Sequence, residues 1–273
     1  MSVPRLTVIG ECLIDVGPSG VREVPTGDAA TLALAAAQTA HVHETCLATA
    51  LGDDPLSDAA ARTLDAAGIR TMFVQRLPGE LPALSVRAEE AGDPLIWRNG
   101  TAIRRMFPVH PGYLSEIGAS DVVALTATSL AVLPEGGRKT LVQLLRDVRT
   151  AGRRVALLLG SNPTLWSESE ATRETDRLLG LCSTLFAGRR ELETLFGALA
   201  GDAAIDALHA RGVTEVVIWD RSGGTLASAG EHRVQRKSTT LPVPASLAGR
   251  FLAHRLAGAE IEAALDDALL LKP

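Results

Sequence analysis

Residues 238–256 (STTLPVPASLAGRFLAHRL) combine a short polar loop with an apolar helix, an arrangement that can bind an anion. Leu247 and Phe251 recur at helical spacing, so we expect one face of this helix to be buried. The first turn of a helix has unpaired backbone N–H groups, and its dipole attracts negative charge. Pro242 and Pro244 lie just before the helix, and proline has no N–H to donate. The sequence therefore predicts an anion site that lacks two of its donors.

Apolar runs and helical patterns alternate along most of the chain. Strands are expected at residues 6–10, 46–51, 122–127, 154–159, 184–187, 215–219, 225–229 and 233–237. Helices are expected at residues 29–40, 55–68, 139–151, 170–181, 190–196, 203–211 and 260–271, and in the stretch described above. Asp28 is expected to be the N-cap of the first helix. This alternation predicts an α/β fold, with a doubly wound, mostly parallel sheet that carries helices on both faces.

Short β segments separated by Gly and Pro turns do not fit inside that sheet. They are expected at residues 71–76, 84–88 and 95–98, and a further hairpin is expected at residues 11–25. We therefore expect a single domain over residues 1–273, with a small antiparallel β lid built from residues 11–25 and 82–100.

The composition predicts a sizeable core, since 46% of the 273 residues are hydrophobic and 22% are charged. The net charge is -5 and no long run of Lys or Arg occurs, which argues against nucleic acid as a main partner. No apolar run can span a bilayer and no secretory signal follows Met1, so a cytoplasmic protein without membrane contact is expected. Cys12, Cys46 and Cys182 are expected to be reduced, structural thiols.

The two commonest nucleotide-binding fingerprints are missing, because neither GxxxxGK followed by Ser or Thr nor GxGxxG after the first strand occurs. Six other stretches occur in order: residues 10–15 (GECLID), 25–40 (PTGDAATLALAAAQTA), 52–55 (GDDP), 97–102 (WRNGTA), 160–166 (GSNPTLW) and 188–192 (GRREL). Together they resemble the motifs of the ribokinase-like (PfkB) carbohydrate kinase family. The likeness depends on the order and spacing of the motifs, and it covers nearly the whole chain.

The resemblance implies a ribokinase-like fold and a sugar kinase activity. Such an enzyme transfers phosphate from ATP to a hydroxyl of a small sugar or sugar acid with the help of Mg²⁺, often as a homodimer packed through the lids. Physically, the sugar must be oriented, a base must assist hydroxyl attack, and donors with Mg²⁺ must stabilise the transferred phosphoryl group.

The resemblance also assigns five residues to the sugar. Asp15 corresponds to an aspartate that holds sugar hydroxyls, and Gly27 and Thr31 lie in the sugar-binding segment, where Thr31 replaces an asparagine. Arg98 is suited to the carboxylate or keto group of a sugar acid because its guanidinium is planar, and Asn162 is suited to a ligand contact. Three of these residues also have a structural alternative: a turn carboxylate for Asp15, a lid-surface salt bridge for Arg98, and a contact with a loop backbone for Asn162.

On the nucleotide side, residues 219–224 (WDRSGG) stand where the family has T-L-G-x-x-G. Arg221 replaces a glycine that lets the backbone approach the nucleotide, whereas Gly224 is retained. Glu191 corresponds to a glutamate that orients water around Mg²⁺, although Gly188 replaces the asparagine of the same motif. The alternative for Glu191 is a solvated helix residue.

The family's reaction centre, D-T-T-G-A-G-D-A-F, corresponds to residues 238–246 (STTLPVPAS). Leu241 and Val243 replace the two glycines, Pro242 replaces the alanine between them, and Pro244 stands at the position of the base. Loss of a general base typically lowers the rate by about 10²–10⁴, and loss of one oxyanion donor by about 10²–10³. The sequence therefore predicts that no catalytic residue of this loop is intact.

Three hypotheses follow from these residues. The first is a carbohydrate kinase family member with weak or no activity. The second is a non-catalytic pseudokinase that binds a sugar, a sugar acid or a nucleoside, or that serves as a partner subunit. The third is an enzyme that uses another carboxylate near Asp15, although the sequence indicates no replacement base.

Overall fold

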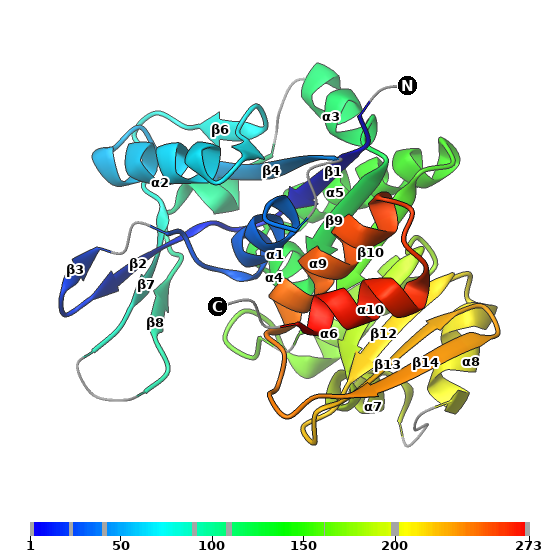
Figure 1. Ribbon diagram of the computed structural model, residues 1–273. Helices are drawn as coiled ribbons and strands as arrows, with labels where there is room; N and C mark the ends of the chain where they lie inside the picture. Colours follow the sequence, from blue (N-terminus) through cyan, green and yellow to red (C-terminus); the bar gives the residue numbers. More distant parts are fainter. Residues whose placement is uncertain are drawn as a thin grey trace.

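The computed structural model describes residues 3–21, 24–39, 43–88, 92–107, 111–160, 162–197 and 202–270. Strands and helices alternate along most of the chain, as expected, and Figure 1 shows a large layered body from which a smaller sheet projects. None of the helices within these ranges is long and apolar enough to cross a membrane.

The larger sheet has ten strands, in the order β14-β13-β12-β11-β10-β9-β1-β4-β5, and β6 also pairs with β4. Its strands are β1 (Arg5–Ile9), β4 (Glu44–Leu51), β5 (Ile69–Arg70), β6 (Val74–Arg76), β9 (Val122–Thr126), β10 (Arg154–Leu158), β11 (Thr184–Gly188), β12 (Glu215–Trp219), β13 (Gly224–Ala229) and β14 (His232–Lys237). Pairing is parallel except at β13 and β14. The central strands are buried almost throughout, because helices cover both faces.

A separate hydrophobic cluster fills the space on each face of this sheet. One cluster packs under α1 (Asp28–Ala37), α2 (Pro55–Ala66), α9 (Pro244–Leu256) and α10 (Ile261–Leu269). The other packs under α3 (Pro111–Gly118), α4 (Ala127–Val132), α5 (Glu135–Thr150), α6 (Glu168–Leu179), α7 (Arg189–Phe196) and α8 (Asp202–Ala210). The predicted doubly wound α/β architecture is thereby confirmed.

Helices α1 and α9 pack closely against each other, as Figure 1 shows near the centre of the molecule. The contact depends on Gly249 of α9, because a Cβ atom at this position would overlap the carbonyl oxygen of Leu32. It would also lie 3.0 Å from the Cβ of Ala35. Small residues on both helices therefore fix α9 against α1.

The smaller sheet has four strands in the order β3-β2-β7-β8, namely β3 (Gly20–Val21), β2 (Leu13–Gly17), β7 (Ala83–Val86) and β8 (Leu95–Trp97). The expected hairpin pairing holds for β2 with β3 and for β7 with β8. The central pair, β2 with β7, is parallel, so the expectation of a purely antiparallel lid was wrong. The expected β segment at 71–76 is also absent from this sheet, because β6 pairs with β4 of the larger sheet.

The cap of α1 and three short helices differ from what the sequence predicted. Gly27, not Asp28, is the N-cap of α1, because the cap has a φ of 97° that favours glycine. Asp28 is the first helical residue, and its carboxylate accepts a hydrogen bond from the Thr128 hydroxyl at 3.1 Å. The short helices α3, α4 and the 3₁₀ helix Ala102–Arg105 were not predicted, since they contain too few turns to show a clear period.

Candidate functional site

The parallel strands of the larger sheet place their carboxyl ends along one edge. The chain leaves β1 toward β4 on one side and later returns to β9 on the other, so the strand order reverses at β1. Ligands of open α/β sheets bind at this kind of edge, beside the reversal. Gly10 and Glu11 follow β1 there, Gly160 follows β10, and Asp220 follows β12.

The N-terminus of α1 lies next to the residues that follow β1. A Cβ atom on Gly27 would lie 3.3 Å from the carbonyl oxygen of Glu11, and the Thr26 and Leu13 backbones exchange hydrogen bonds at 2.9 Å. The Thr31 amide donates to the Gly27 carbonyl at 2.8 Å, and the Thr31 side chain is half-buried. The structure therefore brings Gly27 and Thr31 together at the entrance of α1.

Asp15 lies in the smaller sheet and is fully buried. Its carboxylate accepts a hydrogen bond from the Ser85 hydroxyl at 2.8 Å and pairs with the Arg87 guanidinium at 3.2 Å. Ser85 stands opposite Asp15 on the neighbouring strand β7. The carboxylate is thus held by the sheet itself, and its contact with sugar hydroxyls stays a prediction.

Arg98 and Glu11 form a bidentate ion pair where the two sheets meet. The guanidinium donates to the two carboxylate oxygens at 2.8 and 2.7 Å, and the Arg98 and Glu11 side chains are only 9% and 2% exposed. This pair is buried, unlike the surface salt bridge that was the expected alternative. Glu11 belongs to the GECLID motif but was given no role from the sequence. The contact of Arg98 with a sugar acid stays a prediction.

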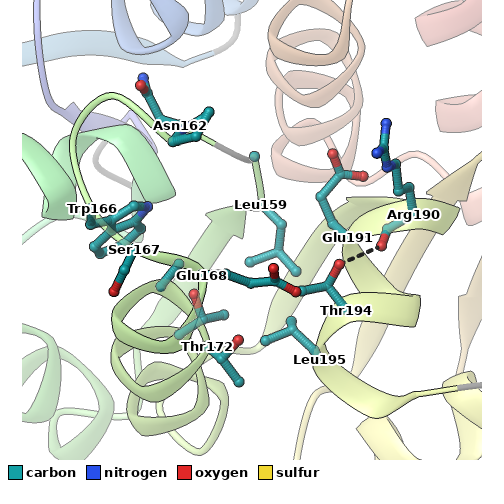
Figure 2. Close-up of a pocket in the computed structure, with 14 residues that line it drawn as sticks. Leu159, Asn162, Trp166, Ser167, Glu168, Thr172, Arg190, Glu191, Thr194 and Leu195 are labelled. Carbon is teal, nitrogen blue, oxygen red and sulfur yellow. Dashed lines mark hydrogen bonds between the residues drawn. The ribbon is translucent and has the colours of Figure 1, made fainter.

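A cavity of about 480 Å³ opens between α6 and α7 at the carboxyl ends of β10 and β11 (Figure 2). It is lined by Leu159, Gly160, Asn162, Pro163, Trp166, Ser167, Glu168, Ala171, Thr172, Thr175, Arg190, Glu191, Thr194 and Leu195. Two predicted site residues, Asn162 and Glu191, therefore border one space. The Asn162 side-chain oxygen accepts a hydrogen bond from the Thr164 hydroxyl at 2.8 Å, a contact with a loop side chain, whereas its expected alternative was a contact with the loop backbone.

The carboxylate of Glu191 occupies space that a side chain at position 188 would need. A Cβ atom on Gly188 would overlap this carboxylate and would lie 3.2 Å from the indole nitrogen of Trp219. The replacement of asparagine by Gly188 therefore allows the present position of Glu191. No group of three or more His, Cys, Asp or Glu residues that could hold a metal ion occurs within the described parts of the chain.

The turn after β12 is stabilised by its own aspartate. The Asp220 carboxylate accepts hydrogen bonds from the Ser222 hydroxyl and from the amides of Ser222 and Gly224. These bonds, the Ser222 hydroxyl bond foremost, lower the pKa of Asp220. Arg221 is exposed at the tip of the turn, and the Gly223 carbonyl accepts from the Ser238 amide at 2.9 Å. The turn thus lies against the loop that enters α9.

The entrance to α9 contains two prolines, Pro242 and Pro244, which have no backbone N–H to donate. Val243 is the N-cap with φ −72° and ψ 116°, no side chain caps the helix, and Pro244 is its first residue. The side chains of Leu241 and Val243 are 57% and 54% exposed. Among the described residues only glycines have positive φ, so this loop lacks the left-handed turns that glycines permit. The predicted role of this loop as an altered anion hole stays a prediction.

The family model and the similar sequences indicate a carbohydrate kinase of the pfkB type, and the similar solved structures share its fold. The model of the family described as "pfkB family carbohydrate kinase" matches residues 4–270. A 2-dehydro-3-deoxygluconokinase of Dickeya dadantii is 28% identical over 253 residues, which span 89% of this chain and 82% of that protein. Among solved structures, a PfkB protein from Polaromonas sp. JS666 has a TM-score of 0.86 at 15% identity and covers 98% of this chain and 94% of its own. A putative ribokinase II of E. coli, solved with ATP and Mg²⁺, has a TM-score of 0.83 at 15% identity, with 97% and 90% covered.

Proposed function

Because the chain belongs to the pfkB family of carbohydrate kinases, we propose that it binds a sugar acid of the 2-dehydro-3-deoxygluconate type. The activity of the curated relatives supports this ligand class. The binding place that we propose lies between the smaller sheet, acting as a lid, and the carboxyl edge of the larger sheet. Gly27, Thr31 and the Glu11–Arg98 pair border that place.

We further propose that phosphoryl transfer from ATP to this ligand is weak or absent. The observation that carries this proposal is the entrance of α9, where Pro244 occupies the position of the base and contributes no donor. Leu241 and Val243 carry β-carbons at positions where the family has glycines, so the backbone cannot readily curl its N–H groups around an oxyanion.

The residues present fit the cofactors only in part. Glu191 offers one carboxylate at the cavity edge, and Mg²⁺ is often held by one or two carboxylates together with phosphate oxygens. The α9 entrance fits a transferred phosphoryl group poorly, since Pro242 removes a backbone donor and Pro244 stands at the position of the base. Calorimetry with ATP and Mg²⁺ measures whether the nucleotide still binds.

Back-substitution tests the proposal directly. The combined change Leu241→Gly, Pro242→Ala, Val243→Gly and Pro244→Asp should raise turnover of 2-dehydro-3-deoxygluconate by about 10²-fold or more, because it restores donors and a base. The matched control, Leu241→Ala with Val243→Ala, removes bulk without restoring either and should gain nothing. Wild-type turnover of about 1 s⁻¹ or faster, an ordinary enzyme rate, would show that the loop does not prevent phosphoryl transfer.

The alternative function is that of a binding or partner subunit without catalysis.

One face of the smaller sheet favours assembly, because Val21, Val86, Leu95 and Trp97 are exposed there. The strand register aligns Trp97 with Leu84, and Leu95 with Val86, so these side chains share one face. We propose that two copies of the chain pack through this face. Sugar-acid binding without ATP binding would support the non-catalytic alternative.

A further inference from the structure

The turn that follows β8 contains the dipeptide Asn99–Gly100, which the proposed function does not use. Both residues are exposed, at the point where the smaller sheet of Figure 1 connects to the 3₁₀ helix Ala102–Arg105. Gly100 has a φ of 65°, and nothing lies within 4 Å of the place that a Cβ atom would occupy there. Because glycine adopts a wide range of backbone angles without steric cost, the peptide unit between the two residues has room to rotate.

The two groups that can react with each other in this dipeptide have no partner in the described parts of the chain. Neither the side-chain amide of Asn99 nor the backbone N–H of Gly100 makes a hydrogen bond to a described residue. The neighbouring contacts use other atoms, since the Trp97 indole N–H donates to the backbone carbonyl of Asn99 at 3.1 Å. The Thr101 hydroxyl likewise donates to the Arg98 carbonyl at 2.7 Å. The Gly100 nitrogen can therefore approach the side-chain carbon of Asn99 without breaking any of these bonds.

The second asparagine of the chain provides a matched comparison, because the sequence contains only Asn99 and Asn162. Asn162 precedes Pro163, whose backbone nitrogen carries no hydrogen and cannot act as a nucleophile toward the side chain. The Asn162 side-chain oxygen also accepts the hydrogen bond from Thr164. Asparagine is among the thermolabile residues of proteins, and here only Asn99 is followed by an N–H that can attack it.

We propose that Asn99–Gly100 is a site of spontaneous deamidation. The Gly100 nitrogen loses its proton to water or hydroxide and attacks the side-chain carbonyl carbon of Asn99. A C–N bond forms, the bond to the side-chain nitrogen breaks, and this nitrogen leaves as ammonia after taking up a proton. Water then opens the resulting cyclic imide at one of its two carbonyl carbons and gives aspartate or isoaspartate. Water has replaced ammonia, so the change needs no enzyme and no oxidant, and it goes beyond the proposed function.

The isoaspartate product lengthens the main chain by one carbon between Arg98 and Thr101. The far end of this turn is fixed, because Thr101 is 1% exposed and the Ala102 amide donates to the Leu81 carbonyl at 2.9 Å. The near end is fixed by the ion pair of Arg98 with Glu11. The extra carbon therefore displaces one of these contacts, and it loosens the attachment of the smaller sheet to the larger one.

Incubation of the full chain over days, followed by peptide mass spectrometry, tests the proposal. We expect loss of the unmodified Asn99 peptide and the appearance of peptides with the mass of a carboxylic acid in place of the amide. Conversion should be faster at mildly alkaline than at mildly acid pH, because the attacking nitrogen must lose a proton. The Asn162 peptide of the same sample should stay unmodified. An unconverted Asn99, or an Asn162 converted as fast, would overturn the proposal.

Two variants connect the chemistry to its effect on the lid. Asn99→Gln keeps the amide but requires a larger ring for the same attack, so it should abolish both the mass change and labelling by an isoaspartate methyltransferase. Asn99→Asp carries the new charge without the extra carbon, and we expect it to unfold at the same urea concentration as fresh wild type. The isoaspartate fraction of aged wild type, isolated by ion exchange, should unfold at a lower urea concentration. An unshifted midpoint would contradict the loosening of the lid, and unchanged labelling of Asn99→Gln would contradict the site.

Discussion

Glu11 and Arg98 form a buried ion pair between two segments far apart in the chain, and the pair holds the smaller sheet against the larger one. Burying two charges costs desolvation, which only good geometry and mutual pairing offset. Removing one partner leaves the other charge buried and uncompensated. The stability of the junction between the two sheets therefore depends on both residues together.

We predict that Arg98→Met or Glu11→Gln alone destabilises the fold by about 3–5 kcal/mol, measured by urea unfolding. The double variant Glu11→Gln with Arg98→Met should lose clearly less stability than the two single variants lose together, because no buried charge remains. Additive losses would show that the two side chains do not act as a pair. The proposed role of Arg98 in sugar-acid binding is tested separately by calorimetry on the double variant.

At the scale of elements, α2 provides a pH-dependent prediction through its N-cap. Burial raises the pKa of Asp54, but hydrogen bonds from the Ser57 hydroxyl and from the Ser57 and Leu56 amides outweigh it and lower the pKa below 3.8. A lowered folded pKa stabilises the protein above the unfolded pKa, and this stability is lost as the pH falls through the folded value.

Asp54→Ala should therefore cost about 1 kcal/mol at pH 7, and the difference from wild type should shrink as the pH falls below 3.8. Thermal unfolding at several pH values measures this. Asp65→Ala, an exposed change in the same helix, is the control and should stay within about 0.5 kcal/mol at every pH. A pH-independent Asp54 effect would show that the cap does not act through its charged form.

The crossing of α1 and α9 makes a second prediction at this scale. Gly249→Ala should destabilise the fold by about 1–3 kcal/mol, since the new methyl group overlaps the Leu32 carbonyl and backbone cannot easily move aside. Gly136→Ala in α5 is the matched control, because nothing lies within 4 Å of a Cβ there, and it should be neutral or stabilising. Chemical denaturation distinguishes the two. If Gly249→Ala changed the stability no more than Gly136→Ala does, the two helices would be able to move apart without a loss of stability.

At the scale of the whole molecule, the exposed apolar face of the smaller sheet predicts self-association. Leu95 and Trp97 are 67% and 56% exposed, and apolar faces of this kind commonly mark interfaces. Leu95→Asp should shift the chain toward monomer in sedimentation velocity, by placing an unpaired charge in the interface. Met72→Asp changes an exposed apolar residue outside this sheet and should leave the assembly state unaltered. A monomeric wild-type chain would contradict the proposal that two copies pack through this face.

Sequence patterns located most strands of the larger sheet and most of the helices that cover it. Hydrophobic periodicity, and the Gly or Pro residues that end an element, are local properties of the sequence. The patterns misplaced the cap of α1, since the cap residue Gly27 has a φ of 97°, and a backbone angle is not visible in the sequence pattern. They also assigned residues 71–76 to the wrong sheet. A short β segment carries no information about its partner, and β4 supplied that partner through long-range pairing.

The identity of residues 241–244 determines by itself that Pro242 and Pro244 offer no backbone N–H at the α9 entrance, because the missing N–H of proline is covalent. Only the tertiary structure decided that Arg98 faces Glu11, that Gly188 makes room for the Glu191 carboxylate, and that the Trp166 N–H is buried without a hydrogen-bond partner among the described residues. These arrangements join residues from separate elements. Their free energies arise when the strands and helices pack, so no local pattern in the sequence contains them.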